Sequence, residues 1–174
     1  TPSGLAQAVQ GLLIHKLTAE HYHIQLSRVQ RAEQRLRTIR QRLAQIAEID
    51  DSPLNTPRPP DLRQVGVCRD FALLHVSMLR HKGLPARMRV GFAPYLDPTG
   101  TYKYDHWISE YWDRSRSRWT LFDPQIDALQ HELFQIKVDV SDLRRDRDFY
   151  LAGSAWRSCR DGLEKSSLFR FNGR

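Results

Sequence analysis

The sequence predicts an α+β fold in which a buried helix is followed by antiparallel strands. The helix expected to start at Cys68 is almost wholly apolar over residues 71–79, a composition typical of a helix inside a domain. Residues 86–92 then alternate between apolar and polar side chains, which is the period of a half-buried strand. Two further strand-like segments, 106–112 and 117–123, are close enough in sequence to pair as a hairpin.

The N-terminal residues 1–60 are predicted to form a helical arm and a proline-rich linker, ahead of a core over residues 61–174. Residues 5–16 are expected to form one helix, and residues 27–49 carry apolar side chains in steps of three and four along a second. That stripe would line a face of the same domain, although three heptads could also form a coiled-coil seam. Four prolines within residues 51–60 exclude regular structure and predict an extended linker.

The two ends of the core have different signals. Gly83 is expected to stop the Cys68 helix, with Pro85 just beyond it. Residues 126–174 mix acidic and basic residues with short apolar groups, and they are predicted to form helices and loops.

The predicted hairpin brings a histidine and an aspartate together. A four-residue loop would pair Trp112 with Ser117 and place His106 opposite Asp123, with the two side chains roughly 5 Å apart on one face. A slip of one residue would send them to opposite faces of the sheet. Glu110 shares the His106 face two pairs away, and we assign it a structural or substrate-lining role.

Cys68 is the candidate nucleophile because it lies at the expected start of a helix. The helix dipole and the unpaired first amides favour a thiolate there, and those amides could serve as an oxyanion hole. His106 would take the thiol proton, and Asp123 would orient the imidazole. Gln64 could add an oxyanion donor or simply be a polar residue leading into the helix, and Arg69 is a further oxyanion or substrate-lining candidate.

Composition narrows the choice of partner and compartment. The net charge of +7 could attract acidic substrates or nucleic acid, but no aromatic residues interleave with the basic ones, which favours a solvated basic surface over nucleic-acid binding. His15, His21 and His23 lack a matching cluster of ligands, so neither a metal nor another cofactor is expected. Two cysteines make no disulfide framework, and no apolar run is long enough to cross a bilayer, so we expect a reducing, cytoplasmic setting.

Residues 64–125 resemble the transglutaminase-like superfamily, a papain-related group that includes transglutaminases and peptide N-glycanases. The matching segments are Gly66-Val67-Cys68 with Phe71-Ala72, Gly83-Leu84-Pro85-Ala86-Arg87, and the segments of His106 and Asp123. The resemblance implies a papain-like core, with the cysteine-bearing helix packed against an antiparallel sheet and a nucleophile–base–acid triad of Cys68, His106 and Asp123. The short chain is most similar to small bacterial members of the group.

The expected function is thiol-dependent acyl transfer or amide hydrolysis through an acyl-enzyme on Cys68. The substrate would be a peptide or small molecule with an amide or thioester. Hydrolysis and transfer to an amine share this intermediate and differ in whether water is excluded at its breakdown. Val67 and Arg69 stand where crosslinking transglutaminases usually carry Gln and Trp. The alternative is a non-catalytic module of the same fold that binds a peptide or an acidic partner.

Overall fold

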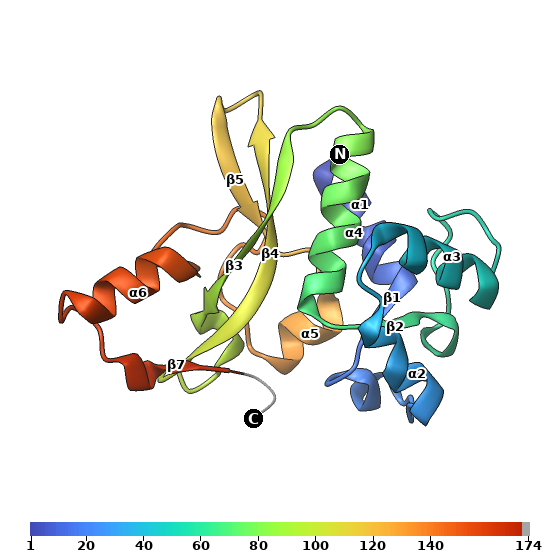
Figure 1. Ribbon diagram of the computed structural model, residues 1–174, viewed down its shortest axis with the longest axis horizontal. Helices are drawn as coiled ribbons and strands as arrows, with labels where there is room; N and C mark the ends of the chain where they lie inside the picture. The colour runs from blue at the N-terminus through green and yellow to red at the C-terminus, as the bar shows by residue number, and fades with distance from the viewer. Residues whose placement is uncertain (172–174) are drawn as a thin grey trace.

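The computed structural model describes residues 1–171, and Figure 1 shows them as N-terminal elements, a central helix and a β-sheet. The α-helices are α1 (Pro2–Leu12), α2 (Arg28–Ala32), α3 (Ile39–Ile49), α4 (Cys68–His81), α5 (Ala128–Leu133) and α6 (Ala152–Arg160). The strands are β1 (Leu13–His15), β2 (Gln64–Gly66), β3 (Ala86–Ala93), β4 (Lys103–Asp113), β5 (Arg118–Phe122), β6 (Tyr150–Leu151) and β7 (Phe169–Arg170). In this part of the chain no helix has the length and apolar content needed to span a membrane.

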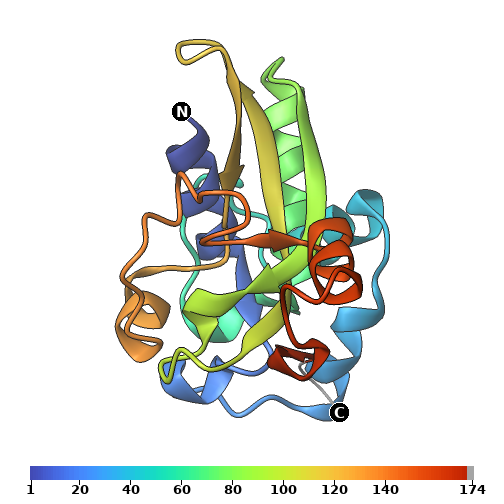
Figure 2. The same ribbon diagram turned by 90° about the vertical axis from the view of Figure 1, so that its left-hand side faces the viewer.

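The larger sheet confirms the predicted α+β class. Its strand order is β5-β4-β3-β6, with antiparallel pairing between these neighbours, and β7 pairs with β4 in parallel. Helix α4 packs on one face of this sheet, while α6 lies on the other side against β3 (Figure 2). The cysteine-bearing helix therefore lies between the sheet and the N-terminal elements.

Helix α4 is buried on two sides, as its composition predicts. Phe71 and Leu74 join a cluster with α1 and α3, while Val76 and Leu79 pack toward β3. Gly83 ends the helix with a positive φ of 74°, and the Leu84 N–H donates to the Leu79 carbonyl at 3.0 Å. This is the left-handed glycine stop expected from the sequence.

The first helix is shorter than predicted. It ends at Leu12 instead of continuing to residue 16, because residues 13–15 form β1 and pair in parallel with β2. The Lys16 N–H extends this contact to the Gly66 carbonyl at 3.0 Å. A pairing with a strand some fifty residues away thus overrides local helical preference.

The single helix predicted over residues 27–49 is wrong. The segment forms α2, a 3-10 turn (η2, Glu33–Arg35) and then α3. Thr38 starts α3 by accepting the Gln41 N–H at 3.2 Å, while the Gln41 side chain accepts the Thr38 N–H at 3.1 Å. This reciprocal capping box begins a new helix in the middle of a continuous apolar stripe.

The predicted division of the chain at residue 60 stays a prediction. Val9, Leu12 and Ile46 share one hydrophobic cluster with Phe71 and Leu74, so residues on both sides of that position pack together. Residues 172–174, the end of the predicted core, lie outside the described residues.

The segment after residue 126 contains strands that its sequence did not predict. Besides α5 and α6, it supplies β6 to the edge of β3 and β7 to β4. Both are only two residues long, too short for an alternating pattern to indicate a strand.

Gly91 provides a test of the packing at the centre of the sheet. It lies between His106 on β4 and Leu151 on β6, and a Cβ there would collide with the Tyr150 carbonyl. We expect Gly91→Ala to lower the free energy of unfolding by about 3 kcal/mol in urea denaturation. The control is Gly153→Ala on α6, where a Cβ meets nothing within 4 Å. It should leave stability unchanged or raise it by up to about 1 kcal/mol, and equal losses in both variants would contradict the prediction.

Candidate active site

A cavity of about 620 Å³ opens at the N-terminal end of α4. Cys68 and His106 both line it, together with residues of the N-terminal segment and residues 133–134. Asp123 is fully buried and bonded to His106. The volume lies in the range of pockets that hold a small molecule or a peptide side chain.

Cys68 is the first residue of α4 and is partly exposed. The first N–H groups of a helix have no partner within the helix, so they and the helix dipole favour an anion at this position. The Cys68 side chain also forms a hydrogen bond with His106. The predicted position of the nucleophile at a helix start is therefore the observed one.

His106 and Asp123 form a buried pair, with 2.8 Å between Nε2 and Oδ2. Because Nε2 faces the carboxylate, contact with the thiol is left to Nδ1. Burial lowers the pKa of His106, but the charge and hydrogen bond of Asp123, with the contact from Cys68, outweigh it and raise the pKa to about 10. The ring is therefore protonated at neutral pH.

The hairpin register differs from the predicted one by two residues. Trp112 pairs with Trp119 rather than Ser117, because the turn lies one residue later in the chain and closes with Asp113 opposite Arg118. A shift of two keeps each side chain on its face, since successive strand residues alternate between faces. Asp123 follows the last residue of β5 and reaches His106 from there, so the predicted contact forms through a different pairing.

Tyr95 is a site residue that the sequence did not point to. Its hydroxyl donates to Asp123 Oδ2 at 2.8 Å, the oxygen that also faces His106. Burial and the neighbouring carboxylate raise the pKa of Tyr95 well above its usual range, so it stays a neutral donor. It lies in a short 3-10 turn after β3, and nothing in its local sequence marks it as a partner of a distant aspartate.

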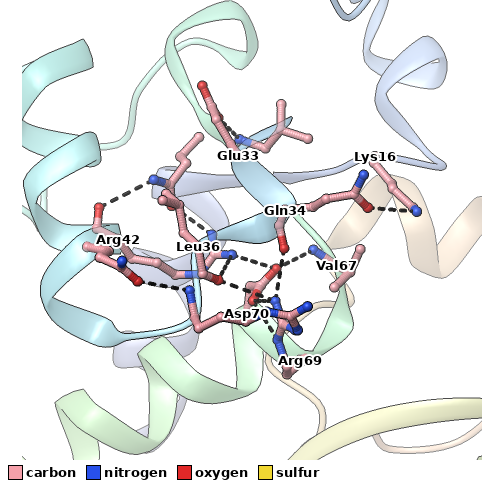
Figure 3. A network of polar contacts seen from close by, with 12 residues as sticks. Lys16, Glu33, Gln34, Leu36, Arg42, Val67, Arg69 and Asp70 are labelled. Carbon is pink, nitrogen blue, oxygen red and sulfur yellow. Dashed lines mark hydrogen bonds and ion pairs between the residues drawn. The ribbon is translucent and has the colours of Figure 1, made fainter. Parts of the chain in front are cut away.

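A network of polar contacts holds the start of α4 (Figure 3). The buried Asp70 carboxylate accepts the Val67 N–H at 2.9 Å and forms ion pairs with Arg42 and Arg69, each at 2.7 Å. These contacts connect the N-terminal residues of the helix to α3. Arg42 is fully buried, so its charge depends on Asp70 for compensation.

The remaining predicted site residues occupy different environments. Arg69 lines the cavity while its guanidinium binds Asp70. The Gln64 side chain is fully buried and accepts from Arg42 Nη1 at 2.8 Å, so its amide is engaged with Arg42 outside the cavity lining. Glu110 is also buried, but it pairs with arginines of β3 and with Arg145 rather than lining the cavity.

Comparisons with known proteins identify relatives of this arrangement. The sequence profile of the transglutaminase-like superfamily matches residues 21–124. A crystal structure of a "putative cysteine protease" from Cytophaga hutchinsonii is similar at 22% identity and a TM-score of 0.31, over 72% of this chain and 39% of that one. This chain thus spans well under half of that protein, and an overlap of this quality supports no statement about reaction or substrate. No curated protein matches the chain.

The Asp70 network provides a test of how the start of α4 is held. Asp70→Asn removes the charge that compensates two arginines, one of them fully buried, and we expect it to lower the free energy of unfolding by about 3 kcal/mol. The matched control is Asp161→Asn, which breaks an exposed ion pair with Arg160 and should cost under about 1 kcal/mol. Urea denaturation of both variants at pH 7 decides, and similar small losses would contradict the prediction.

The raised pKa of His106 predicts a stability that depends on pH. Because the folded pKa of about 10 lies above the ordinary 6.5, the His106 contribution is fully present below pH 6.5 and is lost as the pH rises toward 10. Between pH 7 and 9.5 the parent should lose about 3 kcal/mol more unfolding free energy than His106→Gln. Urea denaturation at both pH values measures this, and equal losses in parent and variant would exclude the assignment. An NMR titration of the ring gives the same pKa directly.

Proposed function

The chain belongs to the transglutaminase-like superfamily, and on that premise we propose that it is a thiol enzyme that forms an acyl-enzyme on Cys68. The observation that carries the proposal is one juxtaposition. A cysteine at a helix N-terminus shares a cavity and a hydrogen bond with a histidine, which is bound in turn to a buried carboxylate. Nucleophile, base and orienting acid are the parts that covalent acyl transfer requires.

The charge on His106 supports the nucleophile. With its pKa raised to about 10, the ring is an imidazolium at neutral pH, and a cation beside sulfur favours the thiolate. Asp123 and Tyr95 hold the ring by binding each other and His106 Nε2, so the orientation of Nδ1 toward Cys68 is set by buried groups. The resting state is therefore an ion pair rather than a thiol with a separate base.

The reaction follows from this ion pair. The Cys68 sulfur attacks the carbonyl carbon of an amide or thioester, a C–S bond forms, and the carbonyl π electrons move to oxygen. When the carbonyl reforms, the bond to the leaving amine or thiol breaks, and His106 Nδ1 gives that leaving group its proton. Water or a primary amine then attacks the thioester with His106 as base, which releases an acid or a new amide and restores the thiolate.

The substrate is a peptide or small molecule that carries such an acyl group. Hydrolysis and transfer use the same residues, and the acceptor for the acyl group decides between them. Both cysteines of the chain are free, and the proposed chemistry requires Cys68 to be reduced.

Alkylation of Cys68 tests the proposed nucleophile. In a Cys159→Ser background we expect iodoacetamide to label Cys68 nearly as fast at pH 6 as at pH 8, because the ion pair supplies thiolate across this range. His106→Ala should slow labelling at pH 6 by tenfold or more and restore the steep pH dependence of an ordinary thiol. Cys68→Ala is the blank, and mass spectrometry identifies the labelled residue. A parent that labels only above pH 8 would favour a non-catalytic binding module of the same fold.

The same protein tests the acyl-enzyme itself. Incubation with p-nitrophenyl acetate should release one equivalent of nitrophenolate in a burst and leave an acetyl group on Cys68. Adding a primary amine then separates the two reactions: acetyl transfer to the amine indicates a transferase, and unchanged release of acetate indicates a hydrolase. Absence of the burst in a parent that alkylates rapidly would overturn the proposed acyl transfer.

A further inference from the structure

His15 lies in the cavity although it is 53 residues before the nucleophile. It is the last residue of β1 and pairs with Gly66, two residues before Cys68. The residue is 8% exposed, and it lines the same cavity as Cys68 and His106. The parallel pairing of β1 with β2 thus places a second imidazole beside the proposed active site.

The hydrogen bonding of His15 determines which nitrogen carries its proton. The Leu17 N–H donates to Nδ1 at 3.3 Å, so Nδ1 is the acceptor and a neutral ring carries its proton on Nε2. The ring also packs near Phe71, with 6.3 Å between the ring centroids. Nε2–H is therefore the hydrogen-bond donor that His15 can offer to a molecule in the cavity.

The surroundings keep this donor neutral. Burial lowers the pKa of His15 to about 3, and the charges of His106 and Lys16 act in the same direction, while Asp123 opposes them. His15 thus remains uncharged wherever His106 is protonated and the protein is folded. A neutral imidazole can donate a hydrogen bond without competing with the imidazolium for the proton that the leaving group needs.

We propose that His15 donates its Nε2–H to the substrate carbonyl oxygen when the Cys68 sulfur attacks, beside the first amides of α4. This inference rests on the proposed function. As the C–S bond forms, the carbonyl electron pair becomes an oxyanion, and donors that are already oriented stabilise it without rearranging. His15 has no role in activating the sulfur, which His106 performs.

Two substitutions of His15 separate this role from a structural one. His15→Gln places its amide near the position of Nε2 and so retains a donor toward the cavity. His15→Asn places its amide near the position of Nδ1, so it can still accept from Leu17 but has no donor that reaches the cavity. Loss of one oxyanion donor typically slows acyl transfer on the order of a hundredfold, and activated esters are less sensitive.

Each variant is measured with two reagents in the Cys159→Ser background. Iodoacetamide alkylates the thiolate by displacing iodide and forms no oxyanion, whereas p-nitrophenyl acetate acylates it through one. We expect His15→Asn to slow acylation at least tenfold while alkylation stays within twofold of the parent, and His15→Gln to recover most of the acylation rate. The selective loss should be constant from pH 6 to 9, because His15 does not titrate there.

The matched control is His75, a second buried histidine on α4. Its ring bonds Ser109 Oγ and the Pro2 carbonyl, each at 3.0 Å, and it does not line the cavity. His75→Gln should change stability and leave the ratio of acylation to alkylation at the parent value.

The remaining outcomes overturn the inference in distinguishable ways. Equal acylation in the Asn and Gln variants, or parallel loss of acylation and alkylation in both, would mean that His15 supports the fold or the thiolate rather than the oxyanion. A parent that alkylates but forms no acyl-enzyme would overturn the proposed function, and this inference with it.

Discussion

The site depends on one buried carboxylate, that of Asp123. It accepts from His106 and Tyr95 on one oxygen and from the Gln125 N–H on the other, so three segments meet at it. A carboxylate without these partners would be too costly to bury, and the imidazolium without the carboxylate would be equally so. The pair therefore fixes the ring of His106, keeps it protonated and holds it at the mouth of the cavity.

A second buried carboxylate holds the other half of the site. Asp70 joins the start of α4 to Arg42 of α3, and it does so one turn or less from Cys68. Helix α4 lies between the two carboxylates, with the sheet on one side and the N-terminal elements on the other (Figure 1). The sulfur and the ring can meet because each is anchored from its own side of that helix.

The structure and the sequence agree where burial has a local period. The apolar run after Cys68 predicts α4, its glycine stop is observed, and the alternation at 86–92 predicts most of β3. They disagree where two pairings bury the same face. The hairpin register is shifted by two residues because alternation determines the face of a strand but not its partner, and Asp123 still reaches His106 because the shift preserves that face.

The sequence by itself determined the helix that carries Cys68, the strand that carries His106 and the candidate triad with Asp123, since each has a signal within a few residues. Only the tertiary structure decided that residues 13–15 form a strand with β2, that Tyr95 shares the Asp123 carboxylate, and that His15 lines the cavity while Gln64 binds Arg42. The physical reason is that these contacts join segments far apart in the chain. Their free energy comes from the partner, and no local period of side chains records it.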